Sequence, residues 1–238
     1  DNEIQKTISF LVFAGLSASA SAALITNGFT FAVASAGGNT SAGTHFHNNT
    51  GGAFGNPAGK AEVGRFYSEG VRGLSEYNLT GLGTSGIAFV TFNVFKLGGL
   101  FSGSNGFPFT GTISVQAYSG NNLENISDYQ AASLGTIRSF STSGLQVGDI
   151  LSFDIASLYN TAIQQSSSSF GIRLQADPLP GSGALTFDNF RLTTDNQCSV
   201  VLGCSNNQVP EPISPALLSI GLAAIGFSRR KKAIKINF

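Results

Sequence analysis

The chain is poor in the residue types that carry most enzyme chemistry. It has no tryptophan, two cysteines and two histidines among 238 residues, and charged residues make up only 11%. Two cysteines are too few for a disulfide-dense miniprotein. The 13 basic residues are balanced by 13 acidic ones, which leaves no positive excess to neutralise nucleic-acid phosphates. A Ser-His-Asp site would have to use His45 or His47, and no G-x-S-x-G motif accompanies them. These absences argue against a nucleic-acid-binding protein and predict that the chain is not an enzyme.

The zero net charge is the sum of three unlike regions. Residues 1–22 carry one basic and two acidic residues, and residues 23–208 carry seven basic and ten acidic residues. Residues 209–238 carry five basic residues and one acidic residue. Segregation of this kind is typical of export segments at the ends of a chain. The central region is long enough for one domain with a buried core.

The N-terminal region has the pattern of a secretory signal peptide. Residues 8–16 form an apolar run of nine residues, which is too short to span a bilayer. Residues 17–22 alternate serine and alanine and offer A-x-A cleavage sites. We therefore predict a signal peptide at residues 1–22, cleaved after Ala22. The alternative is a buried N-terminal strand.

The C-terminal region combines a proline motif, an apolar segment and a basic cluster. The motif V-P-E-P is followed by an apolar segment at residues 213–227, whose fifteen residues would form a helix of about 22 Å. That length crosses most of a hydrocarbon core of roughly 30 Å. The basic cluster that follows consists of Arg229, Arg230, Lys231 and Lys232. Because such clusters stay on the cytoplasmic side, we predict a transmembrane segment whose C-terminal end faces the cytoplasm.

This order of elements resembles the PEP-CTERM sorting signal of exported proteins, found in bacteria that make extracellular polymeric substance. The resemblance covers residues 209–238, with an extension at residues 233–238 that departs from the usual pattern. It implies that an exosortase, a membrane enzyme with a cysteine nucleophile, recognises Pro210, Glu211 and Pro212. It also implies a precursor anchored in the inner membrane and a mature protein at the cell surface or outside the cell. The alternative is a C-terminal anchor that is never processed.

The pattern of the central region predicts an antiparallel all-β domain at residues 23–195. Short runs of alternating apolar and polar residues are separated by Gly, Asn, Ser and Pro clusters, without long helices between them. The expected strands are Leu24–Val33, Val63–Tyr67, Ala88–Phe95, Thr112–Tyr118, Asp149–Phe153, Phe170–Gln175 and Leu185–Leu192. The alternation predicts that Val90, Phe92, Val94, Ile113, Val115 and Ala117 point into the core.

Three other segments carry weaker signals. The spacing of apolar residues predicts a helix over residues 155–163 with Asp154 as its N-cap, and a second short turn at residues 127–133. Residues 35–60 are rich in Gly and Asn and predict a long surface loop. Charges alternate in sign through residues 62–76, which favours a solvated edge over a ligand groove.

The end of the central region resembles the jelly-roll modules of carbohydrate-binding and DNRLRE-type exported proteins. The resemblance rests on F-G-I-R-L at residues 170–174 and F-D-N-F-R-L at residues 187–192, and it covers residues 111–192. It implies a jelly-roll-like β-sandwich in which Asp188 ligates a structural calcium ion. The alternative role for Asp188 is a hydrogen bond at a strand end. No other cofactor is expected.

Several further residues are candidates for specific roles. His45 and His47 would share one face of a strand and could bind a metal, but no third ligand is near in sequence and the segment reads as a solvated loop. Tyr118 and Tyr129 flank a Gly-Asn-Asn loop and are the candidates for sugar contact. Cys198 and Cys204 predict a disulfide in the linker at residues 196–208, because an exported protein matures in an oxidising environment.

Together these observations predict an exported bacterial cell-surface or extracellular-matrix protein, sorted by an exosortase, with a structural or polysaccharide-associating role. The first alternative is a carbohydrate-binding module with a defined glycan ligand. The second is a polysaccharide-active enzyme, although nothing in the sequence selects a pair of catalytic carboxylates.

Overall fold

The computed structural model describes residues 24–47, 59–101 and 103–195. Within these ranges the chain forms eleven strands, one α-helix and two 3₁₀ turns. The strands are β1 (Leu24–Asn27), β2 (Phe29–Ser35), β3 (His45–Phe46), β4 (Ala61–Phe66), β5 (Glu69–Asn78), β6 (Ala88–Lys96), β7 (Thr112–Gly120), β8 (Ser133–Ser141), β9 (Ile150–Asp154), β10 (Ser169–Ala176) and β11 (Gly183–Thr194). The helix is α1 (Ala156–Gln164), and the turns are η1 (Gly38–Thr40) and η2 (Ile126–Gln130).

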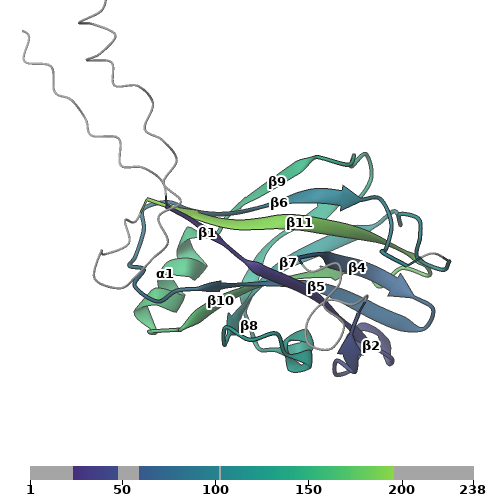
Figure 1. Cartoon of the computed structure of the whole chain (residues 1–238), viewed down its shortest axis with the longest axis horizontal. Helices are drawn as coiled ribbons and strands as arrows, with labels where there is room; N and C mark the ends of the chain where they lie inside the picture. Colours follow the sequence, from purple (N-terminus) through teal and green to yellow (C-terminus); the bar gives the residue numbers. More distant parts are fainter. Residues whose placement is uncertain (1–23, 48–58, 102, 196–238) are drawn as a thin grey trace, which may run out of the picture.

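The strands form one antiparallel sheet that curls into a nearly closed barrel (Figure 1). The hydrogen-bonded order is β8-β7-β10-β5-β4-β11-β6-β9, with β1 added to β11, β2 added to β5, and β3 added to β2. The two end strands of this path approach each other, since the rings of Phe140 on β8 and Phe153 on β9 lie 5.8 Å apart between centroids. The prediction of an antiparallel all-β domain is therefore confirmed. The described strands belong to one continuous hydrogen-bonded sheet, whereas a sandwich would have two separate sheets.

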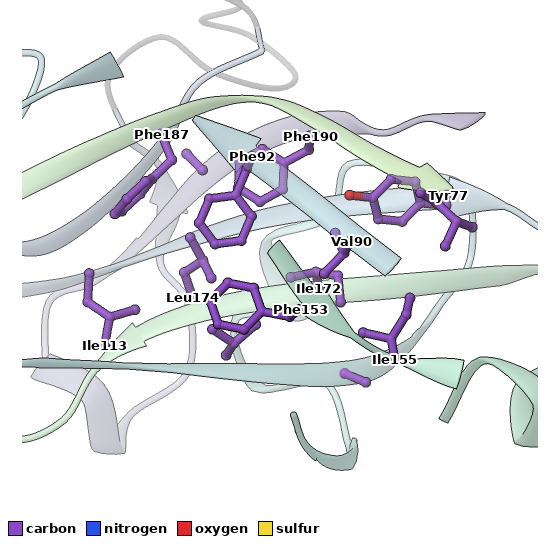
Figure 2. Packing of buried hydrophobic residues seen from close by; sticks show 14 of the residues in the cluster. Tyr77, Val90, Phe92, Ile113, Phe153, Ile155, Ile172, Leu174, Phe187 and Phe190 are labelled. Atoms are coloured by element: carbon purple, nitrogen blue, oxygen red, sulfur yellow. The ribbon is translucent and has the colours of Figure 1, made fainter. Parts of the chain in front are cut away.

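Phenylalanine rings pack together with aliphatic side chains in the barrel interior (Figure 2). Phe92 stacks on Phe190 at 4.6 Å between ring centroids and meets Phe187 edge-on at 5.4 Å. Burying each such side chain contributes about 1.5–3 kcal/mol to stability. The inward positions predicted for β6 and β7 are confirmed, because all six are buried: Val90, Phe92, Val94, Ile113, Val115 and Ala117.

The strand β5 contradicts the sequence-based expectation for residues 62–76. This segment was expected at a solvated edge, yet β5 lies inside the sheet between β10 and β4. Arg72 is 7% exposed and Glu76 is fully buried. The expectation is wrong because the partners of these charged groups come from distant parts of the chain, as described below.

The helix prediction is confirmed with a shift at its start. The N-cap position is Ile155, and Asp154 accepts a hydrogen bond from the Ala156 N–H at 2.9 Å. The helix buries Tyr159 and Ala162 and lies at one end of the barrel (Figure 1). The turn η2 falls in the region where a second short turn was predicted.

The expected loop at residues 35–60 is only partly a loop. Its central residues His45 and Phe46 form β3, which pairs with Ala34 and Val33 of β2. The backbone N–H of His47 continues this pairing by donating to Ala32 O at 2.8 Å. Residues 48–58 lie outside the described ranges.

Both predicted export segments lie outside the described residues, as does the linker with its two cysteines. The signal peptide at residues 1–22, the Cys198–Cys204 disulfide and the transmembrane segment at residues 213–227 therefore stay predictions. Across the ranges that the structure does describe, no helix has the length and apolar character needed to cross a membrane.

Candidate functional site

The two tyrosines predicted to contact sugar lie in the protein interior. Tyr118 and Tyr129 are both 0% exposed. The Tyr118 hydroxyl donates to Glu76 Oε1 at 3.0 Å, and the Tyr129 hydroxyl donates to Gly38 O at 3.0 Å. A fully covered ring offers no face on which a sugar can stack, so in this fold neither ring is available for the predicted sugar contact.

Two buried arginines surround Tyr129. The Arg72 guanidinium lies 4.0 Å from the centroid of the Tyr129 ring and donates to the backbone oxygens of Tyr129 and Asn39. Arg173 donates to Ala131 O at 2.8 Å and to Gln116 Oε1 at 2.8 Å. Burial lowers the pKa of Arg72 to about 10 and also lowers the pKa of Arg173. Most of these donors are directed at backbone carbonyls, so this cluster braces the turns η1 and η2 against the sheet.

Glu76 is a buried carboxylate on the same strand as Arg72. Its carboxylate accepts hydrogen bonds from Ser169 Oγ at 2.8 Å, from the backbone N–H groups of Asn121 and Asn122 at 3.0 and 2.8 Å, and from Tyr118. A buried carboxylate is costly unless its lone pairs are satisfied, and here four donors satisfy them. The Gly-Asn-Asn loop is thereby tied to β5, which is a structural role for residues that the sequence placed beside a sugar site.

Asp188 lies in an open polar cleft beside β11. The cleft has a volume of about 370 Å³ and is lined by Asn27, Gly28, Thr30, Gly59, Lys60, Asp188, Asn189, Phe190 and Arg191. Lys60 Nζ lies 2.6 Å from Asp188 Oδ2 and 3.6 Å from the centroid of the Phe95 ring. The carboxylate of Asp188 is thus balanced by an ammonium. Asp188 itself lies within β11 and not at a strand end. A calcium ion at Asp188 would have to displace Lys60.

A β-bulge in β11 shapes this cleft. The register with β6 shifts between Asp188 and Arg191, and Asn189 adopts a φ of 53°. The bulge allows Phe187 and Phe190 both to point into the core although they are three residues apart, a spacing that a regular strand would place on opposite faces. This spacing in F-D-N-F is a sequence signal for the bulge. Donors and acceptors in the cleft could bind the hydroxyl groups of a polar ligand.

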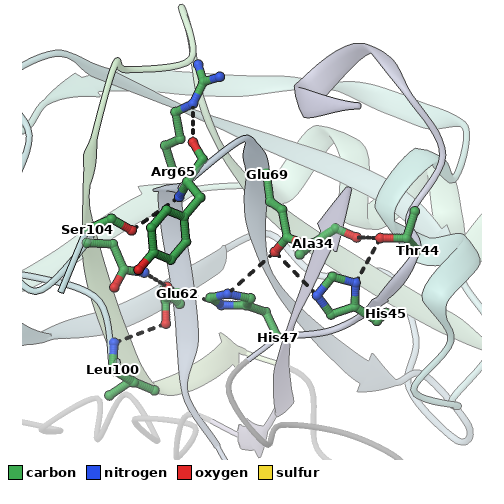
Figure 3. A network of polar contacts seen from close by, with 11 residues as sticks. Ala34, Thr44, His45, His47, Glu62, Arg65, Glu69, Leu100 and Ser104 are labelled. Carbon is green, nitrogen blue, oxygen red and sulfur yellow. Dashed lines mark hydrogen bonds and ion pairs between the residues drawn. The ribbon is translucent and has the colours of Figure 1, made fainter. Parts of the chain in front are cut away.

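A second polar cluster joins the two histidines to two glutamates (Figure 3). His45 Nε2 lies 3.4 Å from Glu69 Oε2, and His47 Nε2 lies 4.0 Å from the same oxygen. His47 Nδ1 lies 3.2 Å from Glu62 Oε1. The prediction of a solvated loop for the pair is wrong, because both residues continue the sheet beside β2 and the His47 side chain is only 3% exposed. Glu69 reaches them from β5, which pairs with the other edge of β2. Among the described residues no group of three His, Cys, Asp or Glu side chains could hold a metal ion.

The tyrosine Tyr67 was not singled out by the sequence. It is 69% exposed, whereas the other four tyrosines of the chain are fully buried. It lies in the turn between β4 and β5 with a φ of 50°, and its ring meets that of Phe66 edge-on at 4.7 Å. The only available signal was the position of Tyr-Ser between two alternating runs, which is the place of a two-residue hairpin turn. A bulky residue at positive φ is uncommon, and here the turn imposes it.

The remaining predicted site residues lie outside the described ranges. They are the sorting residues Pro210, Glu211 and Pro212, the basic cluster Arg229, Arg230, Lys231 and Lys232, and the cysteines Cys198 and Cys204.

Comparison with known proteins identifies the C-terminal region. A family model described as the PEP-CTERM protein-sorting motif matches residues 208–232. This range contains the V-P-E-P motif, the apolar segment and the four-residue basic cluster. A search of curated proteins finds no match to the chain. The motif indicates an exported protein that carries a C-terminal sorting signal and is processed by an exosortase.

Proposed function

We propose that the mature protein is a component of the bacterial cell surface or extracellular matrix, where its barrel has a structural or polysaccharide-associating role. The observation that carries this proposal is the sorting motif at residues 208–232, which follows a β-domain whose last strand ends at Thr194. A stable β-domain attached to a removable sorting signal suits a protein that is delivered to the surface and kept there. We also propose that the protein is not an enzyme.

The proposed route has three steps. The signal peptide at residues 1–22 directs export and is removed. The apolar segment at residues 213–227 then holds the precursor in the inner membrane, with the basic cluster on the cytoplasmic side. An exosortase finally recognises Pro210, Glu211 and Pro212 on the outer side. Two prolines favour an extended backbone, which suits recognition of a peptide by an enzyme groove.

The structural role is supported by the fold. We propose that the barrel is related to jelly-roll modules, since its strands are antiparallel and its sheet curls around a large hydrophobic core. We also propose that a Cys198–Cys204 disulfide closes the linker between the barrel and the sorting signal. Such a small loop would stabilise the domain boundary by roughly 2 kcal/mol.

Association with polysaccharide is supported by two surface features. Tyr67 exposes an aromatic ring that combines a stacking face with a polar hydroxyl, which is the combination that sugars favour. The cleft beside β11 offers hydrogen-bonding groups from Asp188, Asn189 and Arg191. The concave shape of the cleft favours the second candidate function, a carbohydrate-binding module with a defined glycan ligand.

The sorting step is tested by the mass of the mature C-terminus. The chain is expressed in a host that contains its exosortase, and the mature protein is compared with the Glu211→Ala variant and with Asn206→Ala as a control outside the proline motif. We expect a shortened C-terminus in the wild type and the control, and an unprocessed tail in Glu211→Ala. The same C-terminal residue in all three proteins, after the mass change of each substitution is allowed for, would overturn the processing step.

The polysaccharide role is tested by binding of the full chain to a glycan array. Loss of binding in Arg191→Ala would support a defined ligand in the cleft, and loss in Tyr67→Ala would support stacking on the exposed ring. Arg138→Ala is the matched control, because Arg138 is an exposed arginine on β8. Binding to no glycan would leave the structural role as the function, and turnover of a polysaccharide would refute the proposal that the protein is not an enzyme.

A further inference from the structure

The cleft beside β11 lies in a gap between two neighbouring strands. Asn27 at the end of β1 faces Arg191, and Ala61 at the start of β4 faces Phe187. The strand β6 pairs with β11 along both of these segments, so β1 and β4 lie end to end on the opposite edge of β11. Residues 188–190 remain between them, which corresponds to about 10 Å of strand. The cleft is thus an interruption of the sheet edge that the fold itself creates.

The bulge in β11 places three polar residues on the outer side of this gap. Phe187 and Phe190 both belong to the core (Figure 2). Asp188 is partly exposed, and Asn189 and Arg191 are exposed. A carboxylate, an amide and a guanidinium therefore lie close together along the strand, and between them they can both accept and donate hydrogen bonds.

The cleft carries one positive charge without a counterion among the described residues. Lys60 Nζ lies 2.6 Å from Asp188 Oδ2, so these two charges balance each other. None of the ion pairs among the described residues includes Arg191. A guanidinium can bind the paired oxygens of a carboxylate or a sulfate group with two parallel hydrogen bonds. The charge of Arg191 therefore favours an anionic ligand.

The cleft offers no aromatic face for stacking. Among the described residues that line it, Phe190 is the only aromatic one, and it is 2% exposed. A ligand in the cleft must therefore be held by hydrogen bonds and charge, because stacking needs an accessible ring. Hydrogen bonds with an ionised partner are about twice as strong as neutral ones. This argues for a ligand that combines hydroxyl groups with a negative charge.

We propose that the cleft binds a negatively charged sugar unit of a polysaccharide, one that carries a carboxylate or a sulfate group. The proposal rests on the polysaccharide-associating role and names the class of ligand for that site. Arg191 binds the anionic group, and Asp188 and Asn189 bind neighbouring hydroxyl groups. The cleft volume of about 370 Å³ is near the lower end of the range for small-molecule sites, so it takes a short stretch of glycan.

The proposal is tested by calorimetry on the full chain, purified in detergent, with an oligosaccharide of galacturonic acid. The methyl-esterified form of the same oligosaccharide is the matched ligand, because it keeps the sugar rings and lacks the charge. We expect the acidic form to bind at least about 10-fold more tightly and its binding to weaken as the salt concentration rises. A sulfated galactan oligosaccharide forms the second arm, and the tighter of the two acidic ligands identifies the anionic group that Arg191 binds.

The role of Arg191 is tested by three variants. Arg191→Gln should weaken binding of the acidic oligosaccharide at least about 10-fold and remove its advantage over the esterified form. Arg191→Lys keeps the charge but loses the planar fork, so its affinity should lie between those of the wild type and Arg191→Gln. Arg138→Gln, which removes an exposed arginine on β8, is the matched control and should leave the affinity unchanged.

The role of Asn189 is tested by Asn189→Gly. Glycine tolerates the φ of 53° at this position, so the variant removes the side-chain amide and keeps the bulge. It should weaken binding of the acidic and the esterified oligosaccharide alike, by roughly 2- to 10-fold, since the amide binds hydroxyl groups that both ligands share. An effect on the acidic form alone would contradict this assignment.

Three outcomes would overturn the proposal while leaving polysaccharide association intact. The first is equal binding of the acidic and the esterified oligosaccharide, or binding of neutral glycans only. The second is binding of the acidic form that Arg191→Gln leaves unchanged, which would place the anion elsewhere on the protein. The third is a polyglutamate peptide that binds as tightly as the acidic sugar, which would show recognition of charge alone.

A different result would refute the role on which the proposal rests. Binding to no glycan, acidic or neutral, would remove the polysaccharide-associating role together with this ligand class. The melting temperature of each variant shows whether it is folded, so a lost site is distinguished from a lost fold.

Discussion

The ring of Tyr118 lies over Gly171, the residue that faces it across the β7–β10 pair. A Cβ atom at position 171 would overlap the Tyr118 ring. The ring cannot move aside easily, because its hydroxyl is bound to Glu76 Oε1 at 3.0 Å. Burial raises the pKa of Tyr118 well above its usual value, so its hydroxyl stays a donor to Glu76 at neutral pH. The glycine, the ring and the buried carboxylate therefore form one packing unit.

The first prediction concerns this glycine. Gly171→Ala should destabilise the domain by about 2 kcal/mol, because overpacking against the ring costs about 1–3 kcal/mol and exceeds the gain of about 0.4–1 kcal/mol from a less flexible unfolded chain. Gly181→Ala is the matched control, since a Cβ there meets nothing within 4 Å, and it should change stability by less than about 1 kcal/mol. Urea unfolding of both variants measures the difference. Equal stabilities would show that the Tyr118 ring is free to move.

The second prediction concerns the acceptor role of Glu76. Glu76→Ala should lower the free energy of unfolding by at least about 3 kcal/mol, because it leaves several buried donors without a partner. Glu76→Gln should cost less, about 1–2 kcal/mol, since the amide oxygen can replace Oε2 and the amide nitrogen can donate to the Tyr118 oxygen. The two variants are compared by urea unfolding at neutral pH. Equal losses would contradict the assignment of the hydrogen bonds around Oε2.

The third prediction concerns pH. Burial raises the pKa of Asp128 to about 6, with Glu76 raising it further and the Asn125 backbone N–H and Arg173 opposing the shift. Between about pH 4 and pH 6 the folded state therefore holds a proton that the unfolded chain has released. The stability that Asp128 contributes is complete below about pH 4 and is lost as the pH rises through 6.

Asp128→Asn removes this titration and serves as the comparison. The free energy of unfolding of the wild type, measured relative to this variant from pH 4 to 7.5, should fall as the pH rises and become constant above about pH 7. A difference that stays constant, or one that increases with pH, would show that the pKa of Asp128 is not raised.

The comparison of sequence and structure shows where alternation is informative. The strands β6 and β7 carry apolar residues at every second position, and their core faces were predicted correctly. The strand β5 carries Arg72 and Glu76 at buried positions, so its composition resembled a solvated edge. Their hydrogen-bond partners lie 33 to 93 residues away along the chain, so no pattern in the neighbouring sequence predicts them.

In the candidate sites, too, the partners that lie far away in sequence could not be predicted from local patterns. The sequence singled out Asp188, His45 and His47, but their partners Lys60 and Glu69 become neighbours only when the sheet forms. The Gly and Asn content of the segment around the histidines predicts a loop, whereas the pairing of β3 with β2 forms only in the fold. The C-terminal sorting motif was recognisable because its elements are contiguous, and contiguous signals do not need tertiary structure to be read.

The last prediction tests the partner of Asp188. The Lys60 and Asp188 side chains are 16% and 14% exposed, and at 2.6 Å their ion pair should be stronger than a typical surface pair, which contributes up to about 1 kcal/mol. A double-mutant cycle with Lys60→Gln and Asp188→Asn should give a coupling of about 1–2 kcal/mol in urea unfolding. Calcium should not raise the melting temperature of the wild type, because the ammonium already balances the carboxylate. A coupling near zero, together with a calcium-dependent rise that Asp188→Asn abolishes, would instead identify Asp188 as a calcium ligand.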